Sequence, residues 1–192
     1  MAVKSPQLYV RDIKSVLLSE NQIRTRIIEL AEAIAYYYRN KLNNDDLILL
    51  IVLKGAVMFA IDLARAIPLP IQLEFMTLSS YKESTSFSGK VKLIKDFSKD
   101  INARHVLIME DIIDSGQTLL WLLNNLANYH PKSLQVCTLL RKPKAMKHQL
   151  QIAYIGFDIP NEFVVGYGLD FAERYRNLPY IGTLYPEMYK RS

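Results

Sequence analysis

The segment Val106–Thr118 carries most of the side chains in this sequence that could do chemistry. It reads VLIMEDIIDSGQT, with four apolar residues followed by the adjacent acids Glu110 and Asp111. Burying unpaired carboxylates is costly, so two acids at the end of an apolar run indicate a ligand hydroxyl, a metal or solvent beside them. Adjacent strand residues point to opposite faces of a sheet, so at most one acid can point into a given face.

The turn that follows, Asp114–Thr118, has the composition of a phosphate-binding site. Gly116 permits a tight backbone, Ser115 and Thr118 supply hydroxyls, and a helix is expected directly afterwards. The free N–H groups and the positive dipole end of that helix could hold a phosphate. Asp114 does not suit an anion site, so proton transfer or orientation is a better use for it. Taken alone, the turn fits equally well as a plain helix cap, with Asp114 or Ser115 as the N-cap.

The elements that must position this segment alternate between strands and helices. Apolar runs predict buried strands at Leu47–Leu53, Ile71–Leu78, His105–Ile113, Leu134–Leu140 and Ala153–Ile159. Periodicity and stop signals predict helices at Glu20–Lys41, Ala56–Ile67 and Thr118–His130, the first with a Ser19/Gln22 capping box. This alternation predicts an α/β fold with a mostly parallel central sheet flanked by helices. Ligands bind such sheets at the carboxyl ends of the strands.

Three further segments complete the pattern. Ser79–Lys90 is polar and without periodicity, which predicts a long loop that serves as a lid or is disordered. Val91–Phe97 could return as the second strand of a hairpin, and Phe163–Val165 begins a short extended segment. No repeat or linker divides the chain, so one domain over residues 1–192 is expected.

Composition limits the function classes without choosing among them. The chain has 192 residues, 50% of them hydrophobic and 22% charged, as in an ordinary globular protein. Its net charge of +5 fits an anionic small substrate but also permits weak contact with nucleic acid or membrane. The single cysteine, Cys137, excludes a disulfide within the chain and is expected in the core. No apolar stretch approaches the roughly 20 residues of a membrane span, so a cytoplasmic protein is expected.

These segments together resemble a known protein family. Val106–Thr118 is similar to the phosphoribosyl-pyrophosphate signature of the type I phosphoribosyltransferases, and its EDIIDSG form resembles the hypoxanthine-guanine phosphoribosyltransferases in particular. Other segments match the family in the same order: Leu53–Ala56 (pyrophosphate loop), Ser80-Tyr81 (lid), Leu140–Lys142 (purine lysine), Phe163–Asp170 (purine and magnesium segment) and Arg176. The resemblance covers about Leu47 to Leu184, and the short N-terminus looks bacterial.

The resemblance implies purine salvage. The phosphoribosyl group of 5-phosphoribosyl 1-pyrophosphate would pass to hypoxanthine, guanine or both, giving IMP or GMP and pyrophosphate. It also implies the type I phosphoribosyltransferase fold, with a small hood formed by the N-terminal and C-terminal segments and a flexible lid. Mg²⁺ would be the cofactor. A homo-oligomer, dimer or tetramer, is expected, with small-molecule substrates and with neither membrane nor nucleic acid as a partner.

The resemblance also assigns roles to individual residues. The phosphoribosyl group would contact Glu110, Asp111, Asp114, Ser115, Gly116, Gln117 and Thr118, with Asp114 as the catalytic general base. The other contacts would be Lys54, Gly55 and Arg176 for pyrophosphate, Lys142, Phe163 and the Val164 backbone for the purine, and Ser80 and Tyr81 for the lid. Magnesium would meet Asp170, or Glu110 and Asp111 through the ribose hydroxyls.

Each role has a plainer alternative. Lys142 could be a solvated lysine at a strand end, and Phe163 and Val164 could belong to the core. Arg174 could replace Arg176, and Asp170 could cap a helix starting near Phe171. Gln117 departs from the family, which more often has a basic residue there. For the whole chain, the alternative function is a regulatory protein of the same fold that senses phosphoribosyl pyrophosphate and binds RNA or DNA.

Overall fold

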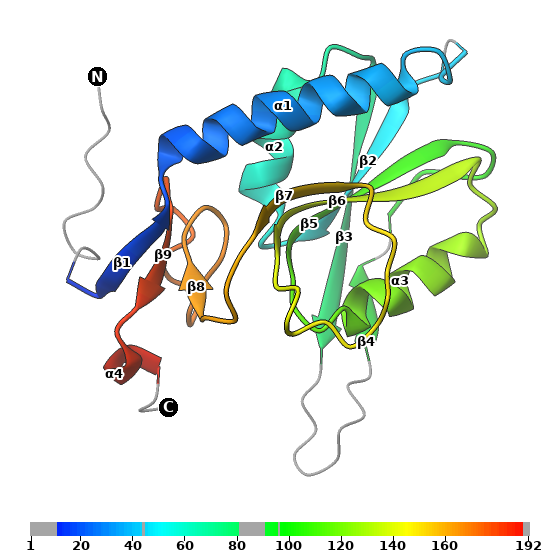
Figure 1. Cartoon of the computed structure of the whole chain (residues 1–192). Helices are drawn as coiled ribbons and strands as arrows, with labels where there is room; N and C mark the ends of the chain where they lie inside the picture. The colour runs from blue at the N-terminus through cyan, green and yellow to red at the C-terminus, as the bar shows by residue number, and fades with distance from the viewer. Residues whose placement is uncertain (1–10, 44, 81–90, 96, 190–192) are drawn as a thin grey trace.

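The computed structural model describes residues 11–43, 45–80, 91–95 and 97–189 (Figure 1). In chain order its elements are β1 (Ile13–Leu18), α1 (Glu20–Tyr38), β2 (Leu47–Leu53), α2 (Val57–Ala66), β3 (Ile71–Ser80), β4 (Val91–Lys95), β5 (His105–Ile113), α3 (Gln117–Ala127), β6 (Ser133–Arg141), β7 (Tyr154–Asp158), β8 (Val164–Val165), β9 (Ile181–Leu184) and α4 (Pro186–Tyr189). The predicted helices and buried strands are therefore present, with ends that shift by up to three residues.

The larger sheet has six strands in the order β4-β3-β2-β5-β6-β7. Strands β3, β2, β5, β6 and β7 run parallel, and β4 is an antiparallel edge strand. The prediction of a mostly parallel sheet is confirmed. Strand β5 lies inside the sheet between β2 and β6, so its carboxyl end, with Glu110 and Asp111, opens at the centre of one sheet edge.

Helices cover both faces of this sheet, and the strand residues alternate between them. On β2, Leu49 and Ile51 pack in the core that includes α1 and α2. Their neighbours Ile48 and Leu50 pack in the core that includes α3. Figure 1 shows α1 and α2 above the sheet and α3 below it. Burial on both faces explains why β2 is a continuous apolar run rather than an alternating one.

Helix α1 starts where the sequence indicates. Ser19 is its N-cap, and the Ser19/Gln22 capping box is confirmed. The helix ends at Tyr38, three residues before the predicted end at Lys41. Tyr38 is fully buried, and its hydroxyl donates to Gln135 Oε1 on β6 at 3.0 Å. Among the described residues, no helix has the length and apolarity that a bilayer crossing needs.

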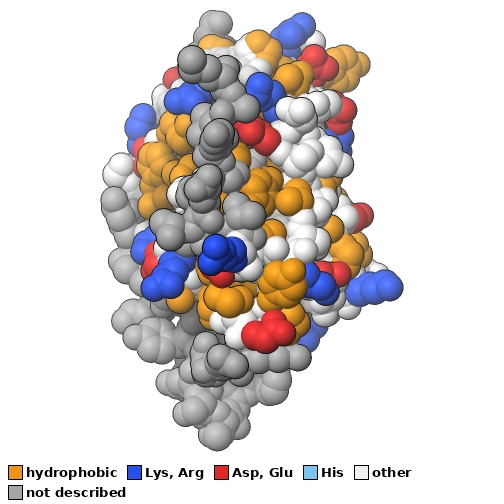
Figure 2. All heavy atoms as spheres, turned by 90° about the vertical axis from the view of Figure 1, so that its left-hand side faces the viewer, with side chains coloured by type: hydrophobic (Ala, Val, Ile, Leu, Met, Phe, Trp, Pro, Cys, Tyr) orange, Lys and Arg blue, Asp and Glu red, His pale blue; other side chains and the backbone are white. Residues whose placement is uncertain are grey.

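A second, three-stranded sheet joins the two ends of the described chain in the order β1-β9-β8. Ile13 pairs with Leu184 in its antiparallel register, and the hydroxyls of Ser15 and Thr183 lie 2.8 Å apart. Strands β1 and β9 were not predicted, because each is short and each pairs with a partner from the opposite end of the chain. Figure 2 views the molecule from this side, where hydrophobic side chains lie among charged ones.

The burial of β2 predicts a difference between two leucines. Leu50 is fully buried, whereas Leu73 on the adjacent β3 is 37% exposed. Leu50→Ala should lower the free energy of unfolding by about 2–5 kcal/mol, since it removes buried methyl groups and leaves a cavity. Leu73→Ala should cost about 1 kcal/mol or less. Urea denaturation of both variants measures the difference, and equal losses would contradict the assigned facing of β2.

Candidate active site

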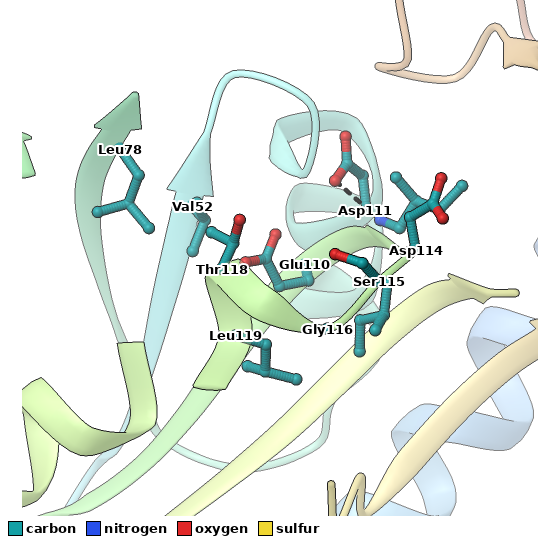
Figure 3. A pocket seen from close by; sticks show the side chains of 11 residues that line it. Val52, Leu78, Glu110, Asp111, Asp114, Ser115, Gly116, Thr118 and Leu119 are labelled. Carbon is teal, nitrogen blue, oxygen red and sulfur yellow. Dashed lines mark hydrogen bonds between the residues drawn. The ribbon is translucent and has the colours of Figure 1, made fainter. Parts of the chain in front are cut away.

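A pocket of about 240 Å³ opens at the carboxyl end of β5 (Figure 3). Val52 on β2 and Leu78 on β3 form one side of it. The remaining lining comes from the end of β5 and the turn into α3: Glu110, Asp111, Ile112, Ile113, Asp114, Ser115, Gly116, Thr118 and Leu119. The segment singled out in the sequence therefore forms the pocket, at the sheet edge where an α/β fold binds ligands.

The adjacent acids Glu110 and Asp111 point to different sides of the sheet, as their alternation predicts (Figure 3). Glu110 is two residues after Ile108 and so points to the same face of the sheet, the one that packs against α3. Asp111 is two residues after Met109 and so points to the opposite face, the one that packs against α1 and α2. The Asp111 carboxylate accepts a hydrogen bond from its neighbour's backbone N–H, Ile112 N, at 2.8 Å. One strand end thus presents two carboxylates in two directions.

Burial changes the proton affinity of both acids. Desolvation raises the pKa of Glu110 well above its ordinary value, and the nearby Asp111 carboxylate raises it further. Desolvation also raises the pKa of Asp111, while the Ile112 N–H and the charge of Arg176 act in the opposite direction. Carboxyls in this condition gain from a hydroxyl donor or a cation placed beside them.

Gly116 shapes the turn into α3. Its φ of 78° is left-handed, a conformation that suits glycine, and it is the N-cap of α3 without a side-chain cap bond. The Asp114 carboxylate pairs elsewhere, and the Ser115 hydroxyl accepts only a long bond from Gln117 N at 3.4 Å. The cap alternative therefore does not describe this turn. Gly116 and Thr118, at the start of α3, line the pocket, so the first-turn N–H groups that have no partner within the helix are potential anion donors there.

A segment that the sequence reasoning did not single out, residues 147–150, packs against this turn. Lys147 N donates to Ser115 O at 3.0 Å, and His148 Nε2 lies 2.9 Å from Gln117 Oε1. A Cβ on Gly116 would lie 2.9 Å from Leu150 Cδ1. The backbone of this segment therefore holds the phosphate turn at Ser115, and His148 lies against the side chain of Gln117. Only the tertiary fold brings this segment to the turn, so no local signal in the sequence marks it.

The loop after β2 meets Asp111 at very short range. The Leu53–Lys54 peptide bond is cis. A Cβ on Gly55 would lie 1.6 Å from Asp111 Oδ2. A Cβ on Gly168, which has a φ of +101°, would lie 2.1 Å from Gly55 O. Three segments therefore converge at a point that admits no side chain at either glycine.

Arg176 is anchored beside this convergence. Its Nη2 lies 2.9 Å from Asp170 Oδ1, and its Nη1 donates to Gly168 O at 2.8 Å. Glu173 Oε2 contacts both Arg176 Nη2 at 3.3 Å and Lys54 Nζ at 3.1 Å. Arg174 is exposed on the same segment, so the geometry favours Arg176 over Arg174. No helix starts near Phe171, so Asp170 does not cap one.

The residues expected around the purine fall into two settings. Lys142 Nζ makes an ion pair with Asp114 Oδ2 at 2.8 Å, and the lysine side chain is only 9% exposed. Lys142 is therefore not a solvated strand-end lysine. Phe163 is 40% exposed and meets Phe171 edge to face at 5.8 Å, so it is not a core residue. The Val164 side chain is buried on β8, which leaves its backbone for any purine contact.

Tyr167 lies in the predicted purine and magnesium segment, but no role of its own was assigned to it from the sequence. It lies between Gly166 and Gly168 with a φ of 51°. Its hydroxyl donates to Asp62 Oδ2 on α2 at 2.6 Å, which ties the turn next to Gly55 to that helix. Burial and the Asp62 carboxylate raise the pKa of Tyr167, so the phenol remains a donor.

The single cysteine, Cys137, is fully buried in the core, as the sequence predicts.

Part of the expected lid lies outside the described residues. This holds for Tyr81, for the rest of residues 81–90 and for the side chain of Ser80, whose backbone ends β3.

Comparisons with known proteins agree with these features. The phosphoribosyl transferase domain family matches residues 19–172. A hypoxanthine-guanine phosphoribosyltransferase from Mycobacterium avium is 60% identical over 187 residues, 96% of this chain and 92% of the relative. The hypoxanthine phosphoribosyltransferase of Haemophilus influenzae is 46% identical over 169 residues, 88% of this chain and 94% of the relative. A solved Trypanosoma cruzi hypoxanthine phosphoribosyl transferase superposes with a TM-score of 0.90 at 39% identity, covering 97% of this chain and 98% of that one. The C-terminal region of that transferase has a role in its oligomeric state and enzymatic activity.

The contact between Gly55 and Asp111 predicts a coupled pair of substitutions. Gly55→Ala should lower the free energy of unfolding by about 1–3 kcal/mol, because the added methyl overlaps the Asp111 carboxylate. In an Asp111→Ala background the same change should cost less, with a coupling of about 0.5–3 kcal/mol. Denaturant unfolding of the four proteins in this cycle measures the coupling. Additive losses would show that the two residues do not meet.

Proposed function

This chain belongs to the phosphoribosyltransferase family, and from that premise we propose that it is a purine-salvage glycosyltransferase. It transfers the phosphoribosyl group of 5-phosphoribosyl 1-pyrophosphate to hypoxanthine, guanine or both, releasing IMP or GMP and pyrophosphate. The relatives reported above are named for this activity at up to 60% identity. None of these relatives has a regulatory name, so nothing favours the alternative of a nucleic-acid-binding sensor.

One observation carries the choice of a 6-oxopurine: Lys142 Nζ lies 2.8 Å from Asp114 Oδ2 at the pocket that holds the phosphate turn. The pair offers a charged donor for a 6-oxo group and an acceptor for a ring N–H. Adenine has an amino group in place of the oxo group, so it would place a donor, not an acceptor, at position 6 against the nine-tenths buried Lys142 side chain. Such a mismatch is a strong source of discrimination.

The phosphoribosyl group would lie along the pocket. Its 5′-phosphate would accept hydrogen bonds from the backbone N–H groups between Ser115 and Thr118 and from their hydroxyls, with Gly116 and Gln117 lying between. The ribose hydroxyls would donate to Glu110 and Asp111, because burial raises the pKa of both carboxyls and a hydroxyl donor would stabilise their charged forms.

The pyrophosphate would meet three groups at the convergence of the β2 loop with the turn after β8. Lys54 and Arg176 supply positive charge, and Gly55 supplies backbone without a side chain in the way. This neutralises the leaving group where its charge develops. Phe163 would stack on the purine, and the Val164 backbone would contact the purine edge. Ser80 and Tyr81 would close the site and exclude water, which is a competing nucleophile.

The residues at the site fit magnesium. Among the described residues, no cluster of three or more His, Cys, Asp or Glu side chains could enclose a metal. Mg²⁺ needs only one or two carboxylates because substrate oxygens and water complete its ligands. Asp170, 30% exposed beside Arg176, would hold such an ion, and Glu110 and Asp111 would reach one through the ribose hydroxyls. When bound, the ion would supply further positive charge to the leaving pyrophosphate.

We extend the proposal to the organisation of the protein. Residues 1–192 would act as one domain, with the β1-β9-β8 sheet as its hood. A homo-oligomer, dimer or tetramer, is proposed because apolar side chains such as Val16, Tyr185 and Met188 are exposed on β1 and near α4. The solved relative's C-terminal region is described in connection with its own oligomeric state. A cytoplasmic location suits a highly charged substrate, which does not cross a bilayer unaided.

The decisive assay offers hypoxanthine, guanine, xanthine and adenine, each with phosphoribosyl pyrophosphate and Mg²⁺. Product is expected with hypoxanthine or guanine and not with adenine. Lys142→Ala should keep phosphoribosyl pyrophosphate binding but lose the preference for 6-oxopurines, because the buried donor is gone. No product with any base would overturn the proposed function. A Lys142→Ala enzyme with unchanged base preference would remove the role of that lysine alone.

Asp114→Asn should separate chemistry from binding. Turnover is expected to fall about 10²–10⁴-fold, because the amide cannot accept the purine proton. The affinity for phosphoribosyl pyrophosphate should change much less, since the phosphate turn remains. Asp158→Asn is the matched control, because Asp158 also pairs with a cation, Arg141, at 2.7 Å. Steady-state kinetics and calorimetric binding give both values. Equal losses in turnover and affinity for Asp114→Asn would make Asp114 a structural residue.

A further inference from the structure

Glu173 occupies the space between two cations that the proposed function assigns to the pyrophosphate. A single oxygen, Oε2, lies 3.1 Å from Lys54 Nζ and 3.3 Å from Arg176 Nη2. The two cations come from segments more than 100 residues apart in sequence, the loop after β2 and the segment after β8. One carboxylate thus joins the two sides of the convergence at Gly55.

The backbone holds Glu173 at this position. Its N–H donates to Asp170 Oδ2 at 2.9 Å. Its φ is +63°, and its neighbour Ala172 has a φ of +52°, so two consecutive residues adopt the left-handed conformation. Non-glycine residues adopt this conformation at a cost, which the surrounding contacts must offset. The carboxylate is therefore presented by a defined turn.

The side chains of this bridge are exposed, and the bridge can be exchanged. Lys54 and Glu173 are each 64% exposed. Exposed ion pairs of this kind contribute little free energy, so a stronger anion can displace them. The hydrogen bonds from Lys54 and Arg176 lower the pKa of Glu173, so it is an anion at neutral pH.

Arg176 has anchors that do not involve Glu173. Its Nη2 lies 2.9 Å from Asp170 Oδ1, and its Nη1 donates to Gly168 O at 2.8 Å. Its Nε is buried and has no hydrogen-bond partner among the described residues. For Lys54, the only ion pair within the described ranges is the one with Glu173. Lys54 is therefore the group that changes partner.

We propose that Glu173 is an internal competitor of pyrophosphate, a carboxylate that neutralises Lys54 and Arg176 until the phosphate groups displace it. The inference rests on the proposed function, because that function assigns both cations to the pyrophosphate. A singly charged carboxylate yields to the more highly charged pyrophosphate and reclaims the cations when the product leaves. Glu173 thus weakens the hold on the product and favours its release.

An alternative role for Glu173 predicts the opposite change in pyrophosphate affinity when this residue is replaced. If Glu173 instead positioned Lys54 and Arg176 for the ligand, its loss would weaken pyrophosphate binding. If it competes, its loss strengthens binding. The sign of the change therefore decides between the two roles, and a general loss of structure cannot produce tighter binding.

The test is calorimetric titration of inorganic pyrophosphate with Mg²⁺ into the full chain, its Glu173→Gln variant and a control. Glu32→Gln is the control, because Glu32 is an exposed acid on α1 and the change in net charge is the same. Glu173→Gln should bind pyrophosphate about twofold to fivefold more tightly, which matches the free energy of an exposed ion pair. The control should change less than twofold. The gain should shrink as salt is raised.

A second readout uses the reaction itself. Pyrophosphate should inhibit Glu173→Gln turnover at concentrations lower by the same factor as the change in binding. If the wild-type enzyme converts hypoxanthine or guanine but Glu173→Gln binds pyrophosphate no more tightly than the wild type, the competitor role alone is overturned. A wild-type protein that converts no base at all overturns the proposed function instead, so the two failures are distinct.

Discussion

The absence of two Cβ atoms allows the rest of this site to exist. Any side chain at Gly55 would overlap the Asp111 carboxylate, and any at Gly168 would overlap Gly55 O. Because both positions are glycine, the loop after β2, the end of β5 and the turn after β8 can lie against one another. Lys54, Asp111 and the residues that follow Gly168 are thereby fixed within reach of one ligand. Glycine loses more conformational entropy on folding than other residues, and here the close approach of backbone segments offsets that cost.

Strand alternation gives the end of β5 its two functions. Because Glu110 and Asp111 are neighbours in an extended strand, one joins the pocket side with Thr118 and the other meets Gly55. Neither carboxylate has a basic side chain within an ion-pair distance among the described residues. Burial raises the pKa of both carboxyls, and the charge of Asp111 raises that of Glu110 further. The strand thus presents a carboxylate on each side of the sheet edge. Burying these carboxylates is unfavourable, and hydrogen bonds from the hydroxyls of a ligand would offset that cost.

Local signals predicted the parts of the structure that local physics determines. The apolar run of β2 and the Ser19/Gln22 box determine a strand and a helix start, and both were located from sequence alone. Pairing between distant segments was not visible. β1 and β9 are short and join opposite chain ends, and the Lys142–Asp114 pair depends on the neighbouring register of β5 and β6. Lys142 and Asp114 were each singled out, yet nothing in their spacing indicates that they meet.

The cations assigned to the ligands are already paired with carboxylates of the chain, and this determines what binding can contribute. Lys142 pairs with Asp114, and Arg176 pairs with Asp170 and Glu173. An anion or a purine that enters therefore exchanges partners instead of neutralising a bare charge, so the net gain is smaller than the direct attraction suggests. Exchange favours a ligand that carries more charge, or more correctly placed acceptors, than the internal partner it displaces. Selectivity for a polyphosphate and an oxopurine then follows from the strength of the internal partners as much as from the shape of the pocket.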